Sequence, residues 1–176
     1  KKLPFFKKVN HIFIERSLNE SILNSNLNVC VSNKLAQLIE RHTSGQSKVY
    51  TLYNGVDLDK FFLKDNFTAC QSSNEKLYNI GCIGNFWPSK GQILLLKAVS
   101  KLKEKIKKNI QITFIGTGPT KSMIMDYAKS NFSEKDIVFI DKIDHNNLLD
   151  FYNSLNLFVL PSYYEALGCV YLEAAA

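Results

Sequence analysis

The sequence predicts an α/β protein in which parallel strands alternate with helices. Four short apolar runs recur from residue 79 onward, and segments with helical periodicity separate them. Strands that alternate with helices of this length form a parallel sheet with right-handed crossovers. The front part of the chain has a different pattern and is separated from the rest by a polar stretch over residues 64–76. We therefore expect the tail of one α/β domain, a linker and most of a second domain.

The front part is interpreted as two helices and two short strands. Its helices are expected over residues 10–24 and 33–41, the second of them capped by Ser32. Its strands are expected over 29–31 and 49–53, followed by a turn at 54–57. Residues 1–54 are accordingly assigned to the tail of a first domain, and residues 55–76 to the linker.

Residues 77–176 are expected to form the second domain. One expected helix, over 91–108, has apolar residues at helical spacing and lysines on its other face. The chain starts without Met and stops in a helical pattern at Ala176, so we expect a fragment of a longer protein. The expected strands are 79–84, 110–115, 137–140 and 157–160, the other helices are 120–131 and 145–154, and the apolar positions of the 91–108 helix are Leu95, Ala98, Val99, Leu102 and Ile106.

Composition limits the classes of partner. The 176 residues carry a net charge of +6, which suits an anionic ligand such as a nucleotide or an anionic membrane surface. No basic arm interleaved with aromatic residues is present, so we expect no nucleic-acid partner. The four cysteines are too far apart for a metal knuckle, and Cys30 and Cys82 lie in apolar runs as expected for buried thiols. Without a signal peptide or an 18-residue apolar run, a reducing, cytoplasmic location is expected.

Two glutamates eight positions apart follow the apolar run at 157–160. Glu165 is expected in the turn from strand to helix, and Glu173 about two helical turns further, roughly 12 Å along the axis. Ligands of parallel α/β sheets bind outside the carboxyl ends of the strands, and carboxylates accept hydrogen bonds from sugar and ribose hydroxyls. The alternative is that Glu165 caps a helix and Glu173 faces solvent.

Two glycine-containing loops follow neighbouring strands. In the first, Gly84 allows close backbone approach, and Lys90 lies at a helix N-terminus. Free N–H groups, the helix dipole and the ammonium together favour an anion such as a diphosphate, although a solvated Lys90 is the alternative. The second loop, residues 116–119, is either a plain crossover turn or one whose glycines open room for a ligand.

Other features are interpreted as structural. Asp57-Leu58-Asp59 resembles a metal-binding DxD but lies in the turn that precedes the linker. A cluster of lysines on the 91–108 helix is either a solvated face or a contact with an anionic membrane surface. The scattered histidines, which we expect at the surface or in caps, are His11, His42 and His145, and the lysines are Lys97, Lys101, Lys103, Lys105, Lys107 and Lys108.

The order of these motifs resembles that of retaining GT-B glycosyltransferases of glycosyltransferase family 4, over nearly the whole chain. The resemblance implies two Rossmann-like domains facing across a cleft, with the nucleotide-sugar donor held mostly by the C-terminal one, truncated here. The motifs that carry it are Asn54-Gly55-Val56-Asp57 with Phe61, then Gly84 with Lys90-Gly91, then Ile115-Gly116-Thr117-Gly118-Pro119, then Pro161-Ser162 with Glu165 and Glu173-Ala174.

The resemblance also implies an activity. A sugar, of hexosyl type, would move from a nucleotide diphosphate sugar to a carbohydrate or lipid-linked hydroxyl acceptor, with retention and without metal or other cofactor. The expected setting is polysaccharide, lipopolysaccharide or glycolipid assembly, in the cytoplasm with peripheral contact at the inner face of the membrane. The acceptor half of the site would lie upstream of Lys1, so the fragment alone is expected to be inactive.

Individual roles follow from the same resemblance. Glu173 would bind the ribose hydroxyls of the donor, Glu165 would be the catalytic residue near the reacting centre of the sugar, and Lys90 would bind the diphosphate. The remaining donor-binding positions are Gly84 and Asn85 of the first loop, and Leu167, Gly168 and Cys169, whose backbone N–H groups would face the sugar and phosphate.

Two positions depart from the family pattern. Asn85 stands where the family usually has Arg, and an amide cannot give the charged, bidentate grip of a guanidinium on phosphate. Asp141 stands where a Gly is common, near the expected nucleobase. Two alternatives therefore stay open: another GT-B enzyme, such as a nucleotide-sugar epimerase or a phosphorylase-like protein, and an inactive sugar-nucleotide-binding partner.

Overall fold

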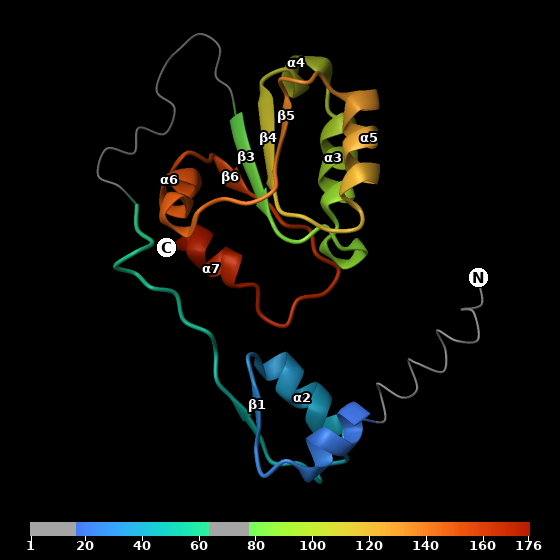
Figure 1. Cartoon of the computed structure of the whole chain (residues 1–176), viewed down its shortest axis with the longest axis vertical. Helices are drawn as coiled ribbons and strands as arrows, with labels where there is room; N and C mark the ends of the chain where they lie inside the picture. The colour runs from blue at the N-terminus through green and yellow to red at the C-terminus, as the bar shows by residue number, and fades with distance from the viewer. Residues whose placement is uncertain (1–16, 64–77) are drawn as a thin grey trace, which may run out of the picture. The chain divides into compact units, whose positions relative to one another are not determined.

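The computed structural model describes residues 17–63 and 78–176 of the chain (Figure 1). The chain divides into two compact units, Lys1–Asn54 and Gly55–Ala176. Each unit contains its own parallel sheet. Among the described residues, no helix is both long and apolar enough to cross a membrane.

The first unit is built on two paired parallel strands, β1 (Asn28–Cys30) and β2 (Val49–Thr51). The helix α2 (Asn33–His42) connects them, and the hydroxyl of Ser32 accepts a hydrogen bond from the backbone N–H of Leu35 at 3.3 Å. This satisfies one of the N–H groups that a helix start leaves unpaired, so the predicted cap is confirmed. Residues 17–24 are helical, and the rest of the helix predicted over 10–24 lies outside the described residues.

The second unit contains a four-stranded parallel sheet in the order β5-β4-β3-β6. The chain adds β4 and then β5 on one side of β3 and returns to place β6 on the other side. This reversal beside β3 is a topological switch point, where open α/β sheets bind ligands outside the carboxyl ends of the strands. The strands are β3 (Tyr78–Ile83), β4 (Ile110–Ile115), β5 (Ile137–Ile140) and β6 (Leu157–Phe158), which confirms the predicted parallel sheet.

Helices cover both faces of this sheet. Figure 1 shows α3 and α5 side by side on one face, with α6 on the other. The alternation of β3 explains the two layers, because Ile80 and Cys82 are buried in the main core, whereas a Cβ on Gly81 would lie 2.3 Å from Leu155, which follows α6. The helices are η1 (Pro88–Lys90), α3 (Gln92–Ser100), α4 (Glu104–Lys107), α5 (Lys121–Asn131), η2 (His145–Asn147), α6 (Leu148–Asn153) and α7 (Cys169–Ala175).

The helix predicted over 91–108 is broken in the structure. The helix α3 ends at Ser100, whose hydroxyl donates to the carbonyl of Lys97 at 3.0 Å, and α4 begins at Glu104. A serine that bonds to the local backbone competes with helix continuation. The buried positions also differ from the predicted ones. Leu102 is 39% exposed and Ile106 is 50% exposed, whereas Leu96, which was not among the predicted apolar positions, is fully buried.

Candidate functional site

Three loops meet at the carboxyl edge of the four-stranded sheet. They follow β3, β4 and β6, and they touch through their backbones. A Cβ on Gly91, at a φ of 68°, would lie 2.1 Å from the carbonyl oxygen of Pro161, and the N–H of Tyr163 donates to the carbonyl of Ser89 at 2.8 Å. A positive φ and this proximity both require glycine at position 91, which lets the loops after β3 and β6 pack together.

The glycine turn after β4 packs against the loop after β3. Gly116, at a φ of 144°, would place a Cβ 2.3 Å from the carbonyl oxygen of Gly84, and a Cβ on Gly118 would lie 2.6 Å from that of Phe86. The neighbouring backbone therefore fills the space that the missing side chains leave. Of the two alternatives for this loop, the contacts favour the plain crossover turn, because the glycines make room for the loop that carries Asn85 and Lys90.

Lys90 and Glu165 form an ion pair across two of these loops. The Nζ of Lys90 lies 2.5 Å from Oε1 of Glu165, and the hydroxyl of Ser162 donates to the same oxygen at 2.9 Å. Both charged side chains are about three-quarters buried. The alternatives of a solvated Lys90 and a helix-capping Glu165 are wrong, because the lysine is paired and α7 begins after Gly168 without a side-chain cap.

The loop after β3 is held by a buried amide. Gln92 is 1% exposed, and its Nε2 donates to the carbonyl oxygens of Gly84 at 3.3 Å and Asn85 at 3.0 Å. The carbonyl of Asn85 is thereby occupied, while the residue itself is exposed at the edge of the sheet. Sequence reasoning missed Gln92, which is the residue that fixes the shape of this loop.

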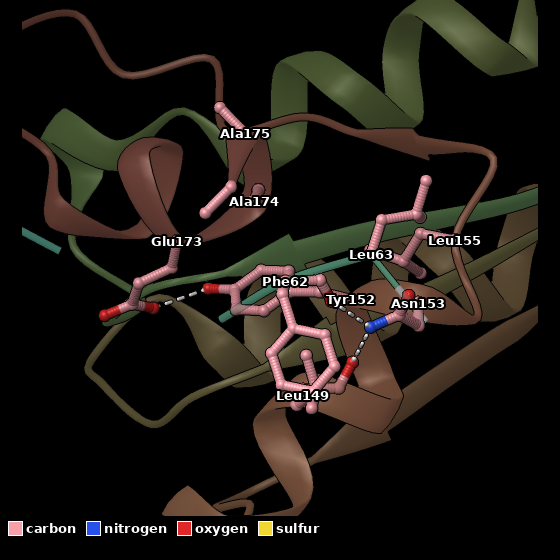
Figure 2. Close-up of a pocket in the computed structure, with 10 residues that line it drawn as sticks. Phe62, Leu63, Leu149, Tyr152, Asn153, Leu155, Glu173, Ala174 and Ala175 are labelled. Carbon is pink, nitrogen blue, oxygen red and sulfur yellow. Dashed lines mark hydrogen bonds between the residues drawn. The ribbon is translucent and has the colours of Figure 1, made fainter. Parts of the chain in front are cut away.

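Glu173 is paired with a tyrosine. The hydroxyl of Tyr152 on α6 donates to Oε2 of Glu173 on α7 at 2.8 Å, as Figure 2 shows. Both residues line a cavity of about 280 Å³. Burial raises the pKa of the Tyr152 hydroxyl, and the hydrogen bond to Glu173 and its negative charge raise it further, so the hydroxyl stays protonated. Because Glu173 is partly buried and accepts a hydrogen bond from Tyr152, the alternative of a solvent-facing Glu173 is wrong. Sequence reasoning missed Tyr152.

The two glutamates are not on one regular helix. Only residues from Cys169 onward are helical, so the rise of an α-helix does not describe the whole interval from Glu165 to Glu173. Gly168 is the N-cap, and a Cβ at that position would lie 2.5 Å from the ring of Tyr171. Leu167 is partly buried and Cys169 is exposed. The start of α7 lies next to Glu165, because a Cβ on Gly168 would lie 3.8 Å from Cδ of that residue.

Asp141 is also paired. It follows β5 and forms an ion pair with Lys121, the first residue of α5. The Nζ of Lys121 donates to the carbonyl of Gly116 at 3.1 Å and lies 5.5 Å from the ring centroid of Phe86. Sequence reasoning missed Lys121, so the position predicted to lie near a nucleobase carries both a negative and a positive charge.

The motifs interpreted as structural behave as such. Oδ1 of Asp57 accepts hydrogen bonds from the backbone N–H groups of Asp59 and Lys60, so this carboxylate closes a turn. His145 packs edge to face on Phe61, and His42 is bonded to a side chain of its own unit, while His11 lies outside the described residues. Within residues 17–63 and 78–176, no three His, Cys, Asp or Glu side chains are grouped as metal ligands.

Comparisons with known proteins identify relatives of most of the chain. The family described as "Glycosyl transferases group 1" matches residues 64–176. The capsular polysaccharide biosynthesis glycosyltransferase CapH of Staphylococcus aureus is 31% identical over 131 residues, which are 70% of this chain and 33% of CapH. CapM of the same organism is 29% identical over 186 residues, which cover 99% of this chain and 43% of CapM.

A solved structure shows the same fold. S. aureus TarM, in a complex with fondaparinux, α-GlcNAc-glycerol and UDP, has a TM-score of 0.72 and 19% identity, covering 91% of this chain and 30% of TarM. The chain thus spans between a third and a half of the curated relatives, CapH and CapM. The prediction of a GT-B-type, Rossmann-like fold is confirmed.

Proposed function

We propose that this chain, which belongs to the group 1 glycosyl transferases, supplies the nucleotide-sugar side of an enzyme that transfers a sugar to a hydroxyl acceptor. One observation carries the proposal: a lysine and a glutamate meet where the carboxyl ends of β3 and β6 adjoin the topological switch point. A second glutamate follows on the next helix. Cationic and acceptor groups together suit a ligand that has both phosphates and hydroxyls.

The proposed transfer builds positive charge on the sugar and negative charge on the departing diphosphate. Lys90 and the N–H groups of Leu167, Gly168 and Cys169 would stabilise the diphosphate. Glu165 would orient the sugar as the catalytic residue, and Glu173 would hold the ribose hydroxyls. Because Glu165 is paired with Lys90 in this structure, the diphosphate would compete with the carboxylate for the N–H donors of the ammonium.

The finer parts of the proposal are retention at the anomeric carbon, hexosyl transfer in the manner of family 4, and no metal cofactor. The fixed positive charge of Lys90 at the phosphate position supports transfer without a metal. Assembly of a cell-surface polysaccharide is supported by the names of CapH and CapM, and lipopolysaccharide and glycolipid assembly are the alternative settings of the proposal. A carbohydrate or lipid-linked acceptor and peripheral contact at the inner face of the membrane complete the proposal.

An inactive sugar-nucleotide-binding partner is the second candidate. It is favoured by Asn85, an exposed amide at the position where the resemblance to the family implies a guanidinium. An amide forms weaker phosphate contacts because it lacks both the charge and the planar fork of arginine. An epimerase or a phosphorylase-like enzyme would share the same phosphate position. The presence of both Glu165 and Glu173 favours transfer over these two activities.

The direct test is consumption of nucleotide sugars by the full-length protein. We expect one of a panel of UDP-, GDP- and ADP-sugars to be consumed with release of the nucleoside diphosphate, and Lys90→Ala to lower the rate by about 10²-fold. Lys97→Ala, which removes an exposed lysine of α3, is the matched control and should leave the rate unchanged. Binding of a nucleotide sugar without consumption would favour the inactive partner instead.

A further inference from the structure

Tyr152 contacts the carboxylate that the proposed function places on the ribose. We propose that Tyr152 is a positioning residue that orients Glu173 toward the ribose hydroxyls of the donor, an inference that rests on the proposed function. The hydrogen bond from Tyr152 engages Oε2 of Glu173 at 2.8 Å. In Figure 2 the two side chains point toward one another from α6 and α7. A carboxylate has room for further donors, so Glu173 can accept from Tyr152 and from a ligand together.

The ring of Tyr152 is held by aromatic side chains on two sides. Its ring packs edge to face on Phe61, with centroids 6.0 Å apart, and on Phe158, with centroids 5.7 Å apart. Phe61 is 4% exposed, and the next residue, Phe62, accepts a hydrogen bond through its carbonyl from Asn153 at 3.1 Å. Aromatic packing on two sides restricts the ring, so its hydroxyl offers the carboxylate one fixed donor position.

The protonation state of Tyr152 agrees with a donor role. Burial is the largest cause that raises its pKa, followed by the hydrogen bond to Glu173 and the charge of that residue. The hydroxyl therefore keeps its proton throughout the pH range in which the protein would act, and Glu173 always faces a donor. A glutamate that is already oriented loses less side-chain freedom when it binds a ligand, which strengthens binding.

The experiment compares Tyr152→Phe with the unchanged protein in binding of a nucleoside diphosphate. The substitution keeps the ring and removes the hydroxyl, so we expect the Kd of the nucleotide to rise by roughly 3- to 10-fold. The KM of the nucleotide sugar should rise by a similar factor, while kcat changes little. The probe is whichever of UDP, GDP and ADP binds the unchanged protein, and binding is measured by calorimetry on the full-length chain.

A sugar-modified nucleotide separates positioning from a general structural role. The 2′,3′-dideoxy form of the same nucleotide lacks the hydroxyls that Glu173 would hold, so Tyr152→Phe should leave its Kd unchanged. The matched control is Tyr127→Phe, which removes a partly buried hydroxyl lying 3.2 Å from Oγ of Ser100 on α3. This control should change neither Kd.

The outcomes distinguish the inference from the function on which it rests. Combining Tyr152→Phe with Glu173→Ala should weaken binding no more than Glu173→Ala alone, because the tyrosine acts through the glutamate. An additive effect, an equal loss for the dideoxy nucleotide, or unchanged binding in Tyr152→Phe while Glu173→Ala is impaired would overturn the inference and leave the function standing. If no nucleotide binds the unchanged protein, the proposed function itself fails, and the inference fails with it.

Discussion

At the scale of single residues, the ion pair between Lys90 and Glu165 joins two side chains to which the proposed function gives opposite tasks. The lysine is to neutralise a diphosphate, and the glutamate is to act near the sugar. Each charge satisfies the other while no donor is bound, and the hydroxyl of Ser162 adds a third contact. Under the proposed function, the diphosphate of the donor would compete with Glu165 for Lys90, and this competition would lower the net affinity for the donor.

Replacing Glu165 by Gln should consequently act in opposite directions on binding and on transfer. We expect a nucleoside diphosphate to bind about 2- to 5-fold more tightly, since a partly exposed ion pair contributes up to about 1 kcal/mol, while sugar transfer falls. Calorimetry and a transfer assay measure the two effects. The control is Glu104→Gln, which releases Lys107 from an ion pair on α4 and should change neither quantity. Weaker nucleotide binding in Glu165→Gln would contradict this account.

Cys82 gives a prediction on alkaline stability. Burial raises the pKa of its thiol from 9.0 to about 12. Between these two pKa values, the folded protein keeps a proton that the unfolded chain releases. The contribution of the Cys82 thiol to the free energy of unfolding is therefore complete below pH 9 and is lost as the pH rises toward 12. Between pH 7 and pH 10, the free energy of unfolding should fall by about 1.4 kcal/mol more in the unchanged protein than in Cys82→Ala. Denaturant unfolding at the two pH values measures this difference. An equal fall in the free energy of unfolding in both proteins would show that the Cys82 thiol does not cause it.

At the scale of elements, the strands and their loops were more predictable than the helices. The bounds of β4 and β5 agree with the predicted ranges because both segments are rich in β-branched and aromatic residues, which favour strands. The long helix over 91–108 was not predictable in detail, since the apolar periodicity continues through the break between Ser100 and Glu104. The choice of Leu96 over Ala98 as a core residue likewise depends on how α3 is rotated against the sheet.

The glycine turn after β4 gives a prediction at this scale. Gly116→Ala should lower the free energy of unfolding by about 1–3 kcal/mol, because it combines a strained φ with a collision against the carbonyl of Gly84. Gly55→Ala is the matched control, since a Cβ there would meet nothing within 4 Å and the φ is not positive. Chemical denaturation of the two variants measures the contrast, and similar losses in both would show that the loop contact is unimportant.

At the scale of the whole molecule, sequence alone predicted the fold and the edge of the sheet where the candidate site lies. The alternation of strands and helices is local, and the position of loops after strands follows from it. The pairing of Lys90 with Glu165, or of Tyr152 with Glu173, depends on segments 75 and 21 residues apart. Side-chain partners at such separations are decided by packing, so Tyr152, Lys121 and Gln92 became visible only in three dimensions.

The proposed function requires that the carboxyl edge of this sheet binds a nucleotide through Glu173. Thermal unfolding of the full-length protein should be followed with UDP, GDP and ADP, with Glu173→Ala in parallel. A ligand at 100 times its Kd stabilises a protein by about 2.7 kcal/mol, which corresponds to a shift of several degrees. One nucleotide should raise the Tm of the unchanged protein and not that of Glu173→Ala. No shift from any of the three, or an equal shift in both proteins, would contradict it.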